Sequence, residues 1–261
     1  MDYFAIDKRY LLYIDILGFT ELVQAGFKRV DELYKVINQL NAHHHYAFHV
    51  ICFSDTLLVY NVIDPMNSQD EKGIVGFLIE FARDLMYRLT KEEINFRAII
   101  VYDEFKHYYQ DKIECYYGNA LIKCYNYEKQ VNGIGLFIDK HIANLAHAPK
   151  VSYDDQLDFI CLLVSIPKVS LYFPNLGDTL ISKEEIEESD QFISIKVEMR
   201  ILKQLYNNSL YNRNPKIRSK NLQTYQFYKF LYGDLLSYLE RFNYDLRTIC
   251  KDANWENISD Y

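Results

Sequence analysis

Strand-like and helix-like segments follow one another in a distinctive order along the first half of the chain. Residues 10–16 form an apolar run that predicts a buried strand, and residues 20–40 carry apolar side chains at helical spacing with a break near Gly26. Two β-rich runs then flank Ser54-Asp55, which predicts a hairpin with a short turn. A helix at 73–89, a strand at 94–102, a helix at 119–130 and a strand at 133–139 complete the series. This order predicts an α+β fold with helices packed on a mostly antiparallel sheet.

The remaining segments are less regular. Residues 103–115 predict an irregular arm or hairpin, and residues 140–148 a short helix. Beyond Pro149 the pattern changes, and we expect a first domain at 1–150 and an extension at 151–261, packed on the first domain or on a dimer partner. In this extension we predict one or two strands within 158–166 and 168–173, and helices at 195–207 and 224–242 joined by a basic loop at 212–220.

Composition narrows the class of protein. A length of 261 residues suits one large domain, or one domain with a smaller appendage. The net charge of −7 does not indicate the positively charged surface that nucleic-acid binding requires. The five cysteines contain no CxxC pair and are typical of a reducing compartment. No run reaches the roughly 18 apolar residues of a membrane span, and the first residues lack a signal-peptide core, so we expect a cytoplasmic protein.

Two acids stand next to predicted strands. Asp15 lies at the end of the first strand, and Asp55 lies in the hairpin turn. If these strands are neighbours, the two carboxylates converge, and such a pair suits the hard cations Mg²⁺ or Mn²⁺. The segment Gly18-Phe19-Thr20 opens the next helix, where backbone N–H groups can hold a phosphate. The pattern alone leaves simpler interpretations open, namely a turn aspartate at Asp55 and a helix cap at Asp15.

Four segments together resemble the class III nucleotide cyclases, which have a ferredoxin-like core. "YIDILGFTEL" resembles their first metal motif, and "ICFSDTLLVY" their hairpin with the second metal acid. "FRAIIVYDEF" and "YYGNALIKCYNYEKQ" resemble the next strand and the aromatic-Gly-Asn segment with its helix, in the same order. Within that family the chain is most similar to the bacterial pyrimidine cyclases of Pycsar anti-phage defence, in its "FSD" turn, its "YGNAL" segment and its helical tail.

The resemblance implies a site and a reaction. Asp15 and Asp55, with the Ile16 carbonyl, would bind two Mg²⁺ or Mn²⁺ ions. Gly18, Phe19 and Thr20 would hold the phosphates, and Arg97 would be a catalytic residue that meets phosphate charge. The reaction implied is conversion of UTP or CTP into the 3′,5′-cyclic mononucleotide and pyrophosphate by two-metal phosphoryl transfer, in a homodimer with sites at the interface.

The sequence departs from the purine-specific members at four positions. Ile51 replaces a lysine on the hairpin, and Cys115 replaces a polar residue that reads the base. Ile122 and Asn126 replace an asparagine and an arginine that orient the ribose and stabilise the transition state. Lys123 is close in sequence, but its side chain would point in another direction from the helix. The changes at Ile51 and Cys115 remove the pair that reads a purine and so favour a pyrimidine substrate, whereas the loss of the arginine at Asn126 should slow the reaction if no other residue replaces it. Together these changes leave a purine cyclase, or a weak or inactive cyclase-fold protein that binds nucleotide or a partner, as alternatives.

A histidine-rich segment precedes the hairpin. It holds His43, His44, His45 and His49, but no recognised zinc-ligand spacing completes it. Tyr46 and His49 lie near the predicted hairpin, which leaves two interpretations: they line a base pocket, or they pack within the strand. The residues predicted to form a base or ribose pocket are Tyr46, His49, Ile51, Cys115, Asn119 and Asn126.

Overall fold

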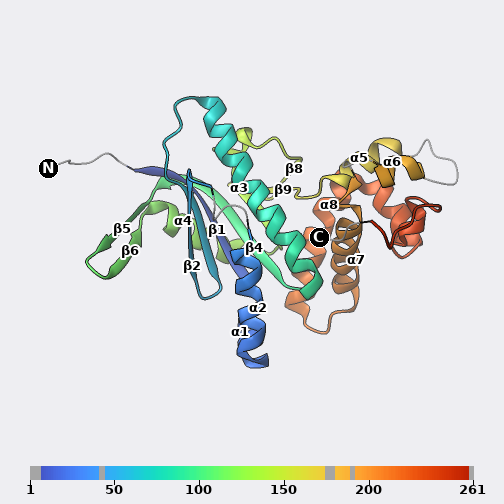
Figure 1. Ribbon diagram of the computed structural model, residues 1–261, viewed down its shortest axis with the longest axis horizontal. Coiled ribbons are helices and arrows are strands. Elements are labelled where there is room, and N and C mark those ends of the chain that lie inside the picture. Colours follow the sequence, from blue (N-terminus) through green and yellow to red (C-terminus); the bar gives the residue numbers. More distant parts are fainter. Residues whose placement is uncertain (1–6, 41–44, 174–179, 189–191, 259–261) are drawn as a thin grey trace. The chain divides into compact units, whose positions relative to one another are not determined.

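The chain divides into two compact units. The computed structural model describes residues 7–40, 45–173, 180–188 and 192–258 (Figure 1). Its units are Met1–Leu162 and Leu163–Tyr261. The division falls further along the chain than residue 150, because two strands after that residue join the sheet of the first unit.

The first unit is built on a mixed sheet. In the part of the chain that the structure describes, its seven strands have the order β2-β3-β1-β4-β7-β9-β8. They are β1 (Lys8–Leu17), β2 (Phe48–Phe53), β3 (Thr56–Asn61), β4 (Asn95–Glu104), β7 (Gly135–Asp139), β8 (Lys150–Ser152) and β9 (Leu157–Ile160). Only β4 and β7 run parallel, and every other pair in this sheet is antiparallel. The predicted α+β architecture is confirmed.

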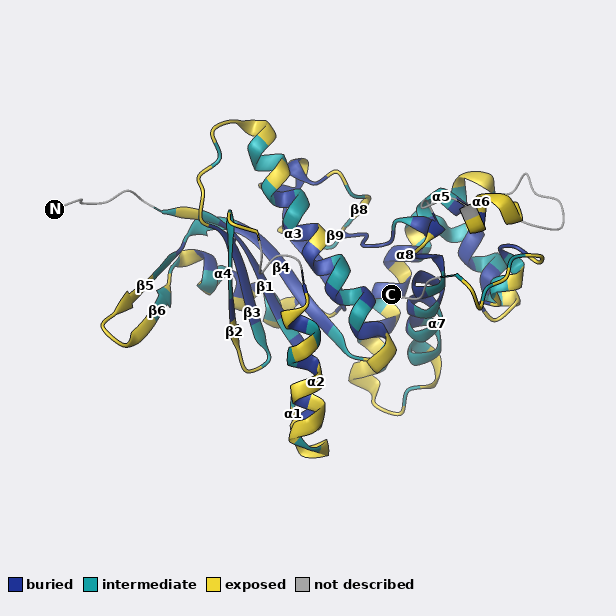
Figure 2. Cartoon of the chain, in the orientation of Figure 1, coloured by how far each residue is buried: buried dark blue, intermediate teal, exposed yellow. Residues whose placement is uncertain are grey.

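Helices cover both faces of this sheet. They are α1 (Phe19–Ala25), α2 (Phe27–Asn38), α3 (Ser68–Leu89) and α4 (Asn119–Gln130), with a 3₁₀ turn η2 (Thr90–Glu92) after α3 and another, η3 (Ala143–Leu145), where a short helix was predicted. Side chains alternate along a strand, and Ile14 faces the core beneath α2 and α3. Leu33 of α2 and Leu78 of α3 belong to the same core. The opposite face meets α4, whose Cys124 Sγ lies 3.9 Å from the backbone oxygen of Ile99. Figure 2 shows β1 and β4 buried along most of their length.

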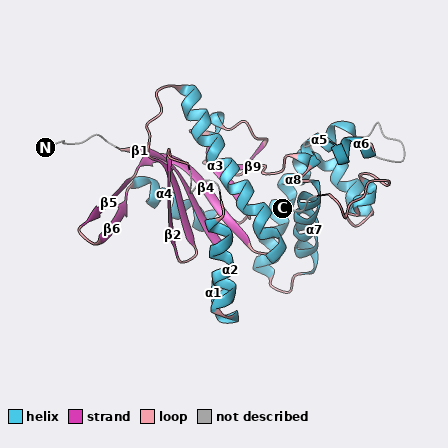
Figure 3. Ribbon diagram, viewed as in Figure 1, coloured by secondary structure: helices cyan, strands magenta, loops and turns pink. Residues whose placement is uncertain are grey.

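A two-stranded arm follows β4. Its strands β5 (Lys106–Gln110) and β6 (Ile113–Tyr117) pair antiparallel in a sheet of their own (Figure 3). Period-two alternation and the register put His107, Tyr109, Glu114 and Tyr116 on one face of the arm. The predicted arm or hairpin at residues 103–115 is therefore present as a hairpin.

The second unit is helical where it is described, and it corrects two predictions. It contains α5 (Ser165–Tyr172), α6 (Lys183–Glu188), α7 (Ile195–Tyr211), α8 (Pro215–Arg241) and the 3₁₀ turn η5 (Leu246–Thr248). Residues 168–173 were predicted as a strand but lie almost entirely in α5. The strand predicted at 158–166 is also shorter than expected, because β9 ends at Ile160 and Ser165 already belongs to α5. This helix begins where the Glu198 carboxylate, on α7, accepts backbone N–H bonds from Val164, Ser165 and Ile166.

The second correction concerns the predicted basic loop at 212–220. Most of this segment forms the first turns of α8. Asn214 caps that helix by accepting from the Lys216 N–H, and Pro215 occupies its first position, as proline commonly does. None of the helices in the described ranges combines the length and the apolar character needed to cross a membrane.

Candidate functional site

One end of the sheet brings together the acids that the sequence singled out. Asp15 lies two residues before the end of β1, opposite Thr56 on β3 and opposite Arg97 on β4. The next residue, Ile16, donates its backbone N–H to the Asp55 carbonyl at 2.8 Å. The turn that carries Asp55 therefore lies directly beside the strand that carries Asp15.

Local backbone structure fixes the hairpin turn at Ser54-Asp55 and the segment Gly18-Phe19-Thr20 that follows β1. Ser54 in the hairpin turn has φ 54°, a left-handed conformation, and its carbonyl accepts a hydrogen bond from the Tyr34 hydroxyl at 3.0 Å. Gly18 has φ 78°, which a glycine adopts without strain, and it forms the N-cap of α1. The chain therefore leaves β1 and enters a helix within a few residues of Asp15, with Phe19 and Thr20 in the first turn.

Tyr13 lies on the same face of β1 as Asp15, and the charges of Asp15 and Asp55 both affect the pKa of its hydroxyl. Burial raises the pKa of its hydroxyl, a hydrogen bond with Thr56 opposes that shift, and the charges of Asp15 and Asp55 raise it further. Both carboxylates are thus close enough to act on one phenol. Asp15 and Asp55 are each half-buried.

We call the region around Asp15, Ile16 and Asp55 the Asp15 corner. The groups there that could bind a metal ion all offer oxygen atoms. They include two carboxylates and the backbone carbonyl of Ile16, which faces the β3 side as its N–H does. Oxygen ligands of this kind fit Mg²⁺ or Mn²⁺ and do not favour softer metals. The residues present therefore fit the divalent ions that the sequence implied.

Arg97 is buried beside Asp15. Its Nη2 lies 3.5 Å from Asp15 Oδ2 and also contacts the Glu128 carboxylate, while Nη1 donates to the Val131 carbonyl at 2.7 Å. Its side chain is only 9% exposed, and burial lowers its pKa while Asp15 opposes that shift. In this arrangement the guanidinium orients Asp15.

A pocket of about 380 Å³ opens on the same face of the sheet. Strands β1 to β3, the arm and α4 contribute to its wall. The lining residues are Tyr13, Ile51, Phe53, Thr56, Leu58, Tyr116, Leu121, Ile122 and Tyr125. The wall contains no charged side chain, and its polar groups are the hydroxyls of Thr56 and the tyrosines. Ile51 and Ile122, two positions where the chain departs from purine cyclases, both belong to it.

The other residues predicted for a base or ribose pocket do not line this one. Tyr46 is 83% exposed, and its ring stacks on that of His45. Cys115 lies on the arm face opposite that of Tyr116, because side chains alternate. His49 faces the arm, Asn119 donates to Glu104 at 3.2 Å, and Asn126 is exposed on α4. His43 and His44 lie outside the described residues.

Two contacts explain how α4 is placed against the sheet. Gly118, its N-cap, has φ 148°, and a Cβ there would lie 2.2 Å from the Glu104 carbonyl oxygen. This close approach requires glycine. Lys123 contacts the buried Asp139 carboxylate of β7, so it points away from the Asp15 corner.

Sequence reasoning missed three residues of this site. Tyr13 could have been found, because a residue two positions before Asp15 lies on the same face of a strand. Thr56 follows the hairpin turn, and its position opposite Asp15 depends on the register between β1 and β3. Glu128 reaches Arg97 from the far end of α4, and no local pattern indicates this contact.

Comparisons with known proteins give structural neighbours only. No protein-family model matches the chain, and no curated protein matches it significantly. The solved structures that are similar include the adenylyl cyclase CyaB from P. aeruginosa, with TM-score 0.44 and 14% identity over 59% of this chain and 93% of that one. The guanylyl cyclase Cya2 has TM-score 0.40 and 16% identity over 59% and 91%.

A third neighbour is the guanylyl cyclase domain of the RhoGC fusion protein from the aquatic fungus Blastocladiella emersonii. It has TM-score 0.43 and 13% identity over 59% of this chain and 96% of that domain. Similarity at this level does not assign an activity to the present chain.

Proposed function

We propose that the chain is a nucleotide cyclase that converts UTP or CTP into the 3′,5′-cyclic mononucleotide and pyrophosphate. The observation that carries this proposal is the convergence of Asp15 and Asp55 at one sheet end, joined by the 2.8 Å hydrogen bond from Ile16 to Asp55. The motif order "YIDILGFTEL", "ICFSDTLLVY", "FRAIIVYDEF" and "YYGNALIKCYNYEKQ" supports the same activity.

The chain's own residues have separate roles in this proposal. Asp15, Asp55 and the Ile16 carbonyl hold the divalent ions, Mg²⁺ or Mn²⁺, and Arg97 keeps the Asp15 carboxylate in place. When bound, such ions activate a hydroxyl nucleophile and neutralise phosphate charge. Backbone N–H groups of Gly18, Phe19 and Thr20 face the β- and γ-phosphates. A direct contact of Arg97 with phosphate requires that it leave Glu128.

The pyrimidine preference rests on the pocket. Its wall has no charged or amide side chain that could read the edge of a purine, since Ile51 stands where a lysine would be needed. Phe53, Ile122 and Tyr125 line it and are between 50% and 66% exposed. A second copy of the chain that covers these apolar side chains would complete the site, as expected for a homodimer. In the family that the sequence resembles, the product signals in anti-phage defence.

One observation favours an inactive alternative. Exposed Asn126 stands where the transition-state arginine would be, and the nearest buried cation, Arg97, is engaged by two carboxylates. A protein with this site can hold a nucleotide and its metal ions without turnover. Measurement of binding and of product in the same sample separates the two functions.

The test is an incubation of the full chain with UTP, CTP, ATP or GTP and Mn²⁺, with detection of pyrophosphate and cyclic mononucleotide. We expect product from a pyrimidine triphosphate and none from Asp55→Asn. The matched control is Asp31→Asn, an exposed aspartate on α2 of the same unit, which should retain full activity. Circular dichroism confirms that each variant is folded.

The outcomes are distinct. Product only from ATP or GTP rejects the pyrimidine preference and keeps the cyclase. Metal-dependent binding of a triphosphate without any product supports the inactive alternative. Activity that survives in Asp55→Asn rejects the metal assignment.

A further inference from the structure

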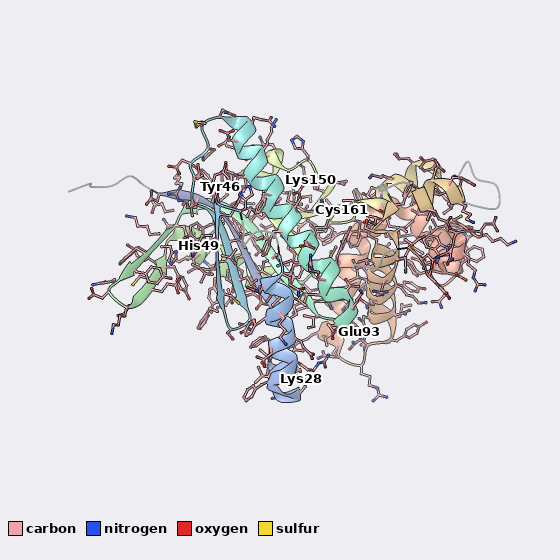
Figure 4. The ribbon with its side chains drawn as sticks, in the orientation of Figure 1. Lys28, Tyr46, His49, Glu93, Lys150 and Cys161 are labelled. Carbon is pink, nitrogen blue, oxygen red and sulfur yellow. The ribbon has the colours of Figure 1, made fainter. Side chains whose placement is uncertain are left out.

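A second cluster of metal-binding side chains lies where β2 meets the arm, on the same sheet face as the pocket. It consists of His49 on β2, His107 on β5 and Glu114 on β6. One ligand atom from each residue lies within 4.8 Å of the others, and His107 Nε2 is 3.0 Å from Glu114 Oε1. The imidazole centroids of the two histidines are 4.9 Å apart. Figure 4 shows His49 on the side of the hairpin that faces the arm.

We propose that His49, His107 and Glu114 bind a transition-metal ion, with Zn²⁺ preferred, and that this ion fastens the arm to the main sheet. Two imidazoles and one carboxylate form a ligand set that suits Zn²⁺ and leaves one tetrahedral position for water. Tetrahedral Zn²⁺ holds ligand atoms about 3.3 Å apart, so His49 needs to approach by on the order of 1 Å. Binding of the ion therefore includes a movement of the His49 side chain.

A supporting contact orients the central ligand. The Tyr60 hydroxyl lies 2.7 Å from His107 Nδ1, so the two ring nitrogens of His107 face different partners. With a metal on Nε2, the ring proton lies on Nδ1 and is donated to the tyrosine oxygen. Metal-bound histidines regularly have such a partner on the other nitrogen.

Burial also favours the neutral form of the His49 imidazole, which is the form that binds metal. Burial lowers the pKa of His49, the neighbouring His107 lowers it further, and Glu114 opposes both. The Tyr109 hydroxyl donates to Glu114 Oε1 at 3.0 Å and helps to hold that carboxylate in place. No other group of three such ligands occurs among the residues that the structure describes.

The position of the cluster suggests what the ion does. A two-stranded hairpin has little stability of its own in water, so the arm depends on contacts with the main sheet. His49 lies two residues before Ile51 on β2, and His107 pairs with Tyr116 on β6. Both Ile51 and Tyr116 line the pocket, so an ion that joins the arm to β2 also fixes the distance between these two parts of the wall.

The experiment uses a full chain that carries Asp15→Asn and Asp55→Asn, which removes the oxygen-ligand site and makes the result independent of the proposed cyclase activity. Zn²⁺ binding is measured by equilibrium dialysis, and Co²⁺ is used as a visible-absorption probe. We expect one Zn²⁺ per chain and a Co²⁺ spectrum typical of tetrahedral coordination. His49→Gln or His107→Gln should weaken binding by more than about a hundredfold, and Tyr60→Phe by about tenfold.

Two control variants keep this test specific. His147 is an exposed histidine outside the cluster, so His147→Gln should bind Zn²⁺ as tightly as the parent, the chain that carries only Asp15→Asn and Asp55→Asn. His45→Gln tests the histidine-rich segment, because His45 packs on Tyr46 and Phe77 and is not part of the cluster. Binding that depends on His45 and not on His49 contradicts the proposal, as does the absence of Zn²⁺ binding.

Hydrogen exchange measures the structural effect. Zn²⁺ should slow exchange in the peptide that covers residues 106–117 by at least about tenfold in the parent chain and leave it unchanged in His49→Gln. Equal exchange with and without bound Zn²⁺ in the parent rejects the role of the ion in fastening the arm. This readout does not depend on any catalytic step.

Discussion

Arg97 on β4 lies directly opposite Asp15 on β1, and its guanidinium Nη2 is 3.5 Å from the Asp15 carboxylate. The same nitrogen contacts Glu128 at the end of α4, and Nη1 donates to Val131 just beyond that helix. One buried side chain thus connects the Asp15 corner to the helix that walls the pocket. Its position gives the half-buried Asp15 carboxylate a cationic partner on the neighbouring strand.

We therefore predict that Arg97→Lys weakens the metal site more than it slows the reaction. A lysine keeps the charge but cannot contact Asp15, Glu128 and the Val131 carbonyl at once, because it lacks the planar fork of donors. The Mn²⁺ concentration for half-maximal activity should rise about tenfold, with a smaller change in the maximal rate. Titration of activity with Mn²⁺ checks this.

The matched control is Arg88→Lys on α3, where the arginine makes an i,i+4 ion pair with Asp84. Such a half-buried pair within one helix contributes about 1 kcal/mol or less, and lysine keeps its charge, so neither activity nor stability should change measurably. A loss of maximal rate in Arg97→Lys without any change in Mn²⁺ requirement would instead indicate that Arg97 contacts substrate.

Gly118 gives a prediction about stability. Its φ of 148° and ψ of 171° belong to a region that only glycine adopts readily, and an added Cβ would meet the Glu104 carbonyl at 2.2 Å. Gly118→Ala should therefore lower the free energy of unfolding by at least about 2 kcal/mol, measured by urea denaturation followed by circular dichroism.

The comparison variant is Gly73→Ala, in an exposed position of α3 where a Cβ meets no atom within 4 Å. That change should stabilise the helix by up to about 1 kcal/mol. Equal effects of the two alanines would show that α4 can move away from β4 without loss.

Most of the first unit could be predicted because local patterns determine it. Helical spacing located α3 and α4, and the β-rich runs on both sides of Ser54-Asp55 located the hairpin. The convergence of Asp15 and Asp55 also followed, since it needs only adjacency of β1 and β3. The residues of the pocket wall could not be predicted from the sequence. Tyr116 belongs to the arm, and the orientation of the arm depends on contacts that no local pattern encodes.

The second unit shows the same limit. Residues 168–173 have β-branched and aromatic side chains that favour a strand, but Glu198 from a distant helix satisfies the N–H groups that begin α5. A cap supplied from another element leaves no sequence signal nearby. At α8 the signal was present, because Asn214 followed by Pro215 is typical of a helix start.

Asp139 predicts a dependence of stability on pH. Burial alone would raise its pKa, but the contacts with Lys123 and with the backbone and ring of His141 outweigh this and lower it. A lowered folded-state pKa means that the stabilisation is present above the unfolded-state pKa of about 3.9 and is lost as the pH falls through the folded-state value. Asp139→Asn should cost roughly 3 kcal/mol at neutral pH.

This difference between the parent and Asp139→Asn should shrink as the pH is lowered below about 4, because the parent then loses the same interaction. Urea denaturation at several pH values measures it. Asp111→Asn serves as the control, since Asp111 is exposed in the arm turn and asparagine also tolerates its φ of 52°. A difference that stays constant down to strongly acid pH would contradict the ion pair.

Glu198 supports the strongest prediction for the second unit. Its carboxylate is fully buried and accepts backbone N–H bonds from Val164, Ser165 and Ile166 at 2.7 to 3.0 Å, together with the Ser194 hydroxyl at 2.9 Å. Glu198→Gln replaces an accepting oxygen by an amide that faces other donors. We expect a loss of about 3 kcal/mol in the free energy of unfolding of this unit.

The sole tryptophan, Trp255, belongs to the second unit, so its fluorescence during urea denaturation reports on that unit. Glu256→Gln, at an exposed position beside it, should leave the transition unchanged and controls for a local effect on the fluorescence. If Glu198→Gln unfolds at the same urea concentration as the parent chain, the N-terminus of α5 does not depend on this carboxylate. In that case its N–H groups find other acceptors, and the assignment of Glu198 as the residue that begins the helix is wrong.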